Sequence, residues 1–120
     1  MKVAVTAQGP ELDSQVDPRF GRAKCFVIVD TETSQVNAVD NTVNLNAVQG
    51  AGIQAAQKVA SMGVSAVVTG HVGPKAFVAL QAGSVSVFTG ASGSVRQAVD
   101  QLKAGLLKQA DKATVEGHWV

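Results

Sequence analysis

The stretch that decides the fold is residues 64–83, VSAVVTGHVGPKAFVALQAG. Its first six residues are mostly apolar and β-branched, so they predict a buried strand. The turn Gly70-His71-Val72-Gly73 follows, and Pro74 then takes the first position of a predicted helix that ends near Gly83. A strand, a glycine turn and a helix in this order form the unit from which parallel α/β sheets are built.

Similar units lie on both sides of this stretch. Apolar residues recur at helical spacing over 52–62, and a strand is predicted over 85–88. Ser94 and Gln97 have the spacing of a capping box, which predicts the start of a further helix. Nearer the amino terminus the sequence predicts three strands, over 2–7, 23–30 and 34–41, and the last two form a hairpin.

The predicted order is β-β-β-α-β-α-β-α, which gives an α/β fold with a five-stranded mixed sheet flanked by helices. The later strands alternate with helices and should run parallel, whereas the early hairpin adds antiparallel edge strands. A length of 120 residues with 46% hydrophobic and 16% charged residues fits one folded core. We assign the single domain to residues 1–108 and predict a loosely ordered tail over 109–120.

Composition excludes several classes of protein. A net charge of +1 argues against nucleic acid as a partner, since phosphate binding requires a clear basic excess. The single cysteine, Cys25, cannot form an internal disulfide or supply the paired thiolates of a zinc or iron–sulfur site. The sequence also lacks an apolar run of the ~20 residues that a membrane span needs. We therefore expect a cytoplasmic monomer or weak dimer that binds neither nucleic acid nor membrane.

Ligands of such sheets bind beyond the carboxyl ends of the parallel strands, which here are the loops after Thr6, Thr69 and Phe88. No Asp or Glu lies between Asp40 and Asp100, so this half of the protein should be electropositive. Two of the loops lead into predicted helix starts, where backbone N–H groups and the helix dipole attract anions. The sequence therefore predicts an anion site, although basic residues can also fall at helix starts by chance.

Residues 17–26, DPRFGRAKCF, are the densest feature of the chain, with three cations, one thiol and two aromatic rings. Arg22 is the best candidate anion ligand, because its planar guanidinium donates two parallel hydrogen bonds. The alternative is a solvated basic loop above packed aromatic rings. A lone cysteine early in an apolar strand, such as Cys25, is typically a small buried hydrophobe, although metal ligation stays open. His71 could contact an anion or a metal, or face water.

The sequence does not contain a complete motif of the nucleotide-binding or catalytic kinds considered. Residues 50–55 match a dinucleotide fingerprint as a string, but no acidic residue lies about twenty positions further on. The glycine-rich turn before Lys75 lacks the spacing and the Ser or Thr of a P-loop. No Gly-x-Ser-x-Gly elbow is present. We therefore predict a binding protein and not an enzyme.

Three motifs in order resemble the dinitrogenase iron–molybdenum cofactor biosynthesis family over about residues 1–108: Arg19-Phe20-Gly21-Arg22-Ala23, Gly70-x-x-Gly73-Pro74-Lys75-Ala76-Phe77 and Gly90-Ala91-Ser92-Gly93-Ser94-Val95. The resemblance implies a ribonuclease H-like α/β fold and the binding or carriage of metal–sulfur cofactors. Many members of that family have His where Arg19 stands and Gly where His71 stands. A site poor in thiols and with one loop histidine favours a cluster that brings its own sulfide ligands.

The resemblance and the residues together predict noncovalent binding of a molybdenum–copper sulfide cluster, with an iron–molybdenum cluster as the alternative. A protein that donates or accepts the cluster is the expected partner. Two other functions stay open, an assembly or regulatory role through protein contacts and a small anion- or nucleotide-binding enzyme. The predicted cofactor-binding residues come from all three motifs and their neighbours: Arg19, Phe20, Gly21, Arg22, Lys24, His71, Val72, Gly73, Pro74, Lys75, Phe77, Ser92, Gly93, Ser94 and Arg96.

Overall fold

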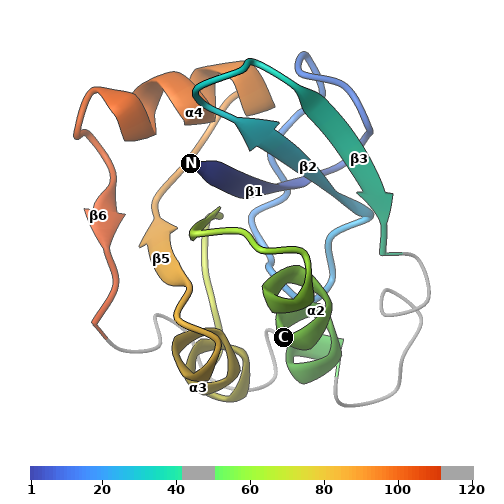
Figure 1. Cartoon of the computed structure of the whole chain (residues 1–120), viewed down its shortest axis with the longest axis vertical. Coiled ribbons are helices and arrows are strands. Elements are labelled where there is room, and N and C mark those ends of the chain that lie inside the picture. The colour runs from blue at the N-terminus through green and yellow to red at the C-terminus, as the bar shows by residue number, and fades with distance from the viewer. Residues whose placement is uncertain (42–50, 112–120) are drawn as a thin grey trace.

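One mixed sheet organises the computed structural model, which describes residues 1–41 and 51–111. In these residues the sheet has six strands: β1 (Lys2–Ala7), β2 (Cys25–Asp30), β3 (Val36–Asp40), β4 (Ala66–Val68), β5 (Ser86–Thr89) and β6 (Lys108–Gln109). Their spatial order is β3-β2-β1-β4-β5-β6 (Figure 1). β1, β4 and β5 run parallel, while β2 and β3 form the antiparallel hairpin beside β1.

The α/β class and the mixed sheet are as predicted, but the prediction of five strands is wrong. The sixth strand, β6, pairs antiparallel with β5 through Phe88↔Gln109 and Thr89↔Lys108. Ala110 N–H extends the contact by donating to the Val87 carbonyl at 2.8 Å. A two-residue strand carries no periodicity that a sequence could display. Residues 112–120 of the predicted loose tail lie outside the described residues.

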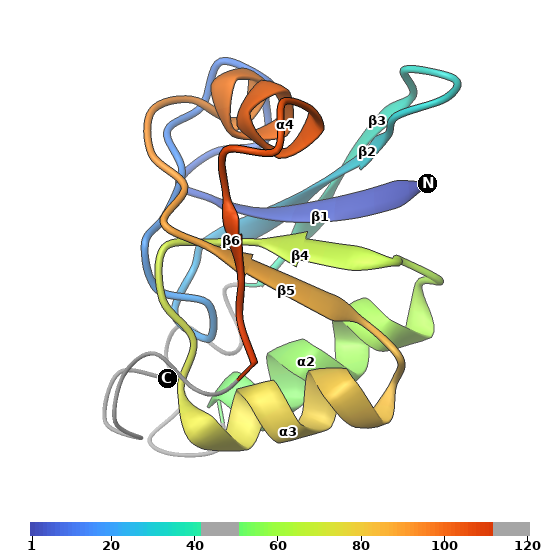
Figure 2. The ribbon, with the colours of Figure 1, turned by 90° about the vertical axis from the view of Figure 1, so that its left-hand side faces the viewer.

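Helices cover both faces of the sheet. α2 (Ala51–Ser61) and α3 (Pro74–Ala82) lie on one face, and α4 (Val95–Lys103) lies on the other, as Figure 2 shows. Alternate residues of β1 supply the two layers, because successive side chains of a strand point to opposite faces. Ala4 belongs to the core under α2 and α3, whereas Val3 and Val5 belong to the core under α4.

The loops that follow β1, β4 and β5 gather at one end of the sheet (Figure 2). This is the end formed by the carboxyl termini of the parallel strands, as the sequence predicted. Most of the long loop after β1, residues 8–24, runs across this end before the chain enters β2. In the described part of the chain, none of the helices has the length and apolar character that crossing a bilayer requires.

Candidate functional site

A short backbone pairing joins the loop after β1 to the loop between β4 and α3. The N–H of His71 donates to the Pro18 carbonyl at 2.7 Å, and the N–H of Phe20 donates to the His71 carbonyl at 3.3 Å. These bonds make a parallel bridge between Arg19 and His71, which we call the seam. A Cβ atom at Gly70 would lie 2.8 Å from both the Cα and the carbonyl oxygen of Pro18. The close approach of the two loops therefore requires glycine at position 70.

Buried polar groups support the seam from below. The hydroxyls of Thr6 and Thr69 lie 2.9 Å apart, and Thr6 Oγ1 lies 2.6 Å from the Asp17 carbonyl oxygen. Since a hydroxyl carries one proton, both contacts are satisfied when Thr6 donates to Asp17 and accepts from Thr69. The buried Asp17 carboxylate accepts the Arg19 N–H at 3.0 Å and lies 3.6 Å from Arg19 Nε. Asp17 thus fixes this turn and offsets part of the Arg19 charge.

Asn41 holds the turn that carries Arg22 and Lys24. Its buried side-chain amide donates to the carbonyls of Ala23 at 2.8 Å and Gly21 at 3.4 Å. Its backbone N–H donates to the Lys24 carbonyl at 2.9 Å. The sequence analysis missed Asn41, as it missed the supporting roles of Asp17, Thr6 and Thr69. The available signals were weak: an asparagine directly after a strand, and threonines at the ends of two strands predicted to be parallel.

The predicted apolar contacts with the ligand lie inside the protein. Phe20 is 1% exposed and packs against Phe26 with ring centroids 5.6 Å apart. Val72 and Phe77 are also buried in the core under α2 and α3. In this structure these side chains hold the loops from below and do not face a ligand. Other predicted residues of these two loops differ, since Arg22 is half-buried and the following are exposed: Arg19, Lys24, His71, Pro74 and Lys75.

The start of α3 faces the seam. Its N-cap is Gly73, Pro74 occupies the first helical turn, and no side chain in the described residues caps it. Lys75, in the same turn, is exposed. The backbone N–H groups of a helix start and a nearby ammonium group both attract anions. The start of α3 and the cationic turn at 22–24 belong to the two loops that the seam joins.

The start of α4 is closed by the protein itself. The predicted capping box is confirmed, with Gln97 N–H donating to Ser94 Oγ at 3.1 Å and Ser94 N–H donating to Gln97 Oε1 at 2.9 Å. The next two N–H groups, of Val95 and Arg96, donate to the loop carbonyls of Ser14 and Leu12, each at 2.9 Å. The backbone donors that we predicted to attract an anion here are therefore already bonded.

The other predicted residues of this junction are also engaged. The Gly93 carbonyl accepts the Val16 N–H at 2.9 Å, and the Ser92 carbonyl accepts the Gln101 side-chain amide at 3.3 Å. Arg96 Nε lies 3.4 Å from Asp13 Oδ1. Ser92, Gly93, Ser94 and Arg96 thus bind the amino-terminal loop to α4.

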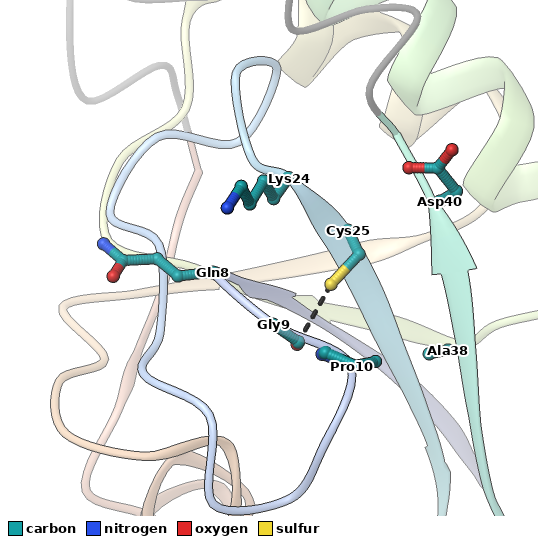
Figure 3. Close-up of a pocket in the computed structure, with 7 residues that line it drawn as sticks. All are labelled: Gln8, Gly9, Pro10, Lys24, Cys25, Ala38 and Asp40. Carbon is teal, nitrogen blue, oxygen red and sulfur yellow. Dashed lines mark hydrogen bonds between the residues drawn. The ribbon is translucent and has the colours of Figure 1, made fainter.

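Cys25 lies in the wall of a pocket of about 370 Å³, shown in Figure 3. Its thiol is buried and donates to the Gly9 carbonyl at 3.0 Å. Burial raises the pKa of the thiol above its usual 9.0, and the negative charge of Asp40 raises the pKa further against a smaller opposing effect of Lys24. Since the thiolate is the form that binds metals, a protonated Cys25 is a poor ligand. The pocket is lined by Gln8, Gly9, Pro10, Lys24, Cys25, Ala38 and Asp40.

Metal-ligating side chains are dispersed in the described residues. No group of three or more His, Cys, Asp or Glu side chains in residues 1–41 and 51–111 could hold a metal ion. The two possible ligands raised by the sequence analysis lie in different places, Cys25 beside Gly9 and His71 beside Pro18. The loop after β1 carries the cations Arg19, Arg22 and Lys24, and Lys75 stands in the first turn of α3.

The fold and this loop arrangement place the chain in a family: it belongs to the dinitrogenase iron–molybdenum cofactor family, whose model matches residues 1–105. The apo form of the orange protein from Desulfovibrio gigas is 46% identical, with a TM-score of 0.92 over 95% of this chain and 96% of that one. A NifB-like protein from Thermotoga, solved by NMR, is 36% identical, with a TM-score of 0.84 over 97% and 98% of the two chains.

A curated relative supports the same assignment at lower identity. An uncharacterized protein of Methanocaldococcus jannaschii is 28% identical over 112 residues, which is 91% of each chain. The predicted family resemblance is therefore confirmed, and so is the single α/β fold. The orange protein and the cofactor family together support metal-cluster binding as the general function.

Proposed function

We propose that this protein binds a preformed, anionic metal–sulfide cluster without covalent ligands from its own side chains, and acts as a carrier and not as an enzyme. The seam is the observation that carries this proposal. It joins the loop that contains Arg22 and Lys24 to the loop that leads into α3, whose first turn carries Lys75. Cations from two distant parts of the sequence would then act at one end of the sheet.

The chemistry of the site suits a cluster that already holds its own sulfides. Such a cluster needs charge and N–H donors from the protein, because its metals are already coordinated. Arg22 can supply a bidentate contact, Lys75 a mobile ammonium group, and the start of α3 backbone donors. Iron–sulfur clusters, in contrast, are held by cysteine thiolates, and the one thiol here is buried and protonated.

We further propose that the cluster is of the molybdenum–copper sulfide type. The likeness to the orange protein, whose solved structure is described as an apo form, supports a ligand-bound state for relatives of this kind. A carrier also requires proteins that donate and accept the cluster. The single protonated thiol of this protein, Cys25, suits a reducing cytoplasm.

Titration of the protein with tetrathiomolybdate and copper tests the proposal. We expect visible charge-transfer bands that saturate with protein, and weaker binding as salt screens charges over a Debye length of about 8 Å. Arg22→Ala should weaken binding by about 1 to 3 kcal/mol through the loss of charge-assisted hydrogen bonds. Lys103→Ala is the matched control, because this exposed lysine lies in the last turn of α4.

Two outcomes would contradict the proposal. Equal weakening by Arg22→Ala and Lys103→Ala would show that only net charge matters and that no localised site exists. A titration without colour, together with a stable complex with another protein, would favour the assembly or regulatory role. Metal and sulfide analysis of protein purified without added metal would then identify what the protein carries.

A further inference from the structure

Helix α3 exposes apolar side chains on its outer side, beside the polar residues Lys75 and Gln81. Ala76, Phe77 and Leu80 face the core. On the outer side Val78 is 65% exposed and Ala82 is exposed. A surface helix normally has a polar outer face, so a valine that is two-thirds exposed is unusual there. The outer face of α3 therefore has the character of a contact surface.

This outer face forms a shallow groove with α2. The groove has a volume of about 440 Å³, and both helices contribute to it. Val78 stands exposed within it, and small side chains on the next turn of α3 leave room for the backbone of another helix to approach. We call it the α2–α3 groove, and its lining residues are Ile53, Pro74, Lys75, Val78, Ala79 and Ala82.

Among the residues that line the groove, the charged one is Lys75. Neither α2 nor α3 contains an Asp or Glu, and Lys58 and Lys75 are their charged residues. The opposite layer differs, because α4 carries Asp100 together with Arg96 and Lys103. A surface with an apolar centre and cationic groups is complemented by a partner with an apolar anchor and carboxylates around it.

A second copy of this chain is a poor occupant. In a two-fold symmetric contact the same patch faces itself, and the residues that line this groove offer no carboxylate to pair with Lys75. The charge distribution thus favours a different protein with acidic groups.

We propose that the α2–α3 groove docks an amphipathic helix of another protein, with leucine-like side chains on one face and Asp or Glu beside them. Helices commonly bind in grooves through apolar anchors spaced three or four residues apart. Val78 and Ile53 would contact the anchors, while Lys75 would pair with a carboxylate. Because Lys75 also belongs to the proposed anion site, the docked helix would lie beside that site, but the docking does not depend on any cluster.

The test uses the apo protein and two synthetic helical peptides. One peptide carries leucine at every third or fourth position with glutamate elsewhere, and the other carries the same leucines with lysine elsewhere. In a ¹⁵N NMR titration the glutamate peptide should shift amides of α2 and α3, and the lysine peptide should not. Val78→Ser should weaken glutamate-peptide binding about tenfold, because it removes a buried valine from the contact.

Leu106→Ser is the matched control, since Leu106 is 75% exposed and lies beyond the end of α4. Equal binding of both peptides, shifts outside α2 and α3, or no shifts at all would overturn the proposal. So would self-association in sedimentation experiments that Val78→Ser abolishes, because the occupant would then be a second copy. Val78→Ser is also titrated with tetrathiomolybdate and copper. The same colour as in the native protein would show that this variant has lost peptide docking without losing cluster binding.

Discussion

The starts of α3 and α4 are built from the same unit, a parallel strand followed by a glycine turn and a helix, yet they end in different states. At α4 a capping box and two loop carbonyls bond the first backbone donors. At α3 the N-cap is a glycine, and no side chain in the described residues caps the helix. The difference teaches that two similar helix starts are not equally available to a ligand, because the protein itself bonds the donors of one of them.

One loop produces both states. Residues 12–16 of the loop after β1 bond to the start of α4, through Val95 N–H to Ser14 and Arg96 N–H to Leu12. Further along the same loop, residues 18–20 pair with His71, two residues before the N-cap of α3. The loop thus bonds the backbone donors of one helix start and only pairs with the segment before the other. Variants at the two helix starts can test whether this difference decides where an anion binds.

The largest difference should come from removing the positive charge near each of the two helix starts in turn. Lys75→Ala should weaken thiomolybdate–copper binding by about 1 to 3 kcal/mol, because a charge-assisted contact with the anion is lost. Arg96→Ala should leave binding nearly unchanged, since Arg96 Nε already lies 3.4 Å from Asp13 Oδ1. Parallel visible titrations of the two variants measure the difference. Stronger weakening by Arg96→Ala would reverse the comparison and move the site to α4.

A smaller effect is expected from removing the cap of α4. Ser94→Ala should lower the free energy of unfolding by about 1 kcal/mol, because the N–H of Gln97 loses its acceptor. Urea unfolding measures this change, with Ser92→Ala, two residues before, as the matched control. Cluster binding should be the same in both variants. A loss of binding in Ser94→Ala without a loss of stability would mean that the cap contacts the ligand.

The smallest effect is expected for the pH dependence of stability that comes from Cys25, a residue that belongs to neither helix start. Its pKa is raised in the folded protein, so its contribution to stability is full below the unfolded value of 9.0 and is lost as pH rises through the folded value. Urea unfolding between pH 7 and 10 should therefore show a steeper decline for the native chain than for Cys25→Ala. Both should bind the cluster. Identical pH profiles of the two proteins would show that folding does not raise the pKa of the Cys25 thiol. Loss of all bound metal in Cys25→Ala would show that Cys25 is a metal ligand.

Local chemistry is what the sequence made predictable. Pro74 at a helix start, the capping box of Ser94 and the apolar strand before Gly70 each act within a few residues. The grouping of the loops after the parallel strands followed from topology alone. The resemblance to the cofactor family was also confirmed, since the family model matches residues 1–105.

Contacts between residues far apart in the sequence could not be predicted from the sequence. Nothing near Ser94 indicates that carbonyls some eighty positions earlier, at Ser14 and Leu12, would take the donors of its helix. Burial decides in the same way whether an aromatic ring such as Phe20 faces a ligand or the core. The strand β6 was missed because its two residues are ordered by pairing with β5 and not by their own pattern.

The seam consists of bonds between backbone groups, with the N–H and carbonyl of His71 facing the carbonyl of Pro18 and the N–H of Phe20. Such bonds do not depend on which side chains stand at positions 19 and 71, while Gly70 is required for the loops to meet. The scaffold can thus stay constant while the side chains displayed at those two positions are exchanged. Under the proposed function, changes at positions 19 and 71 would alter the side chains offered to the anion without a new loop having to evolve.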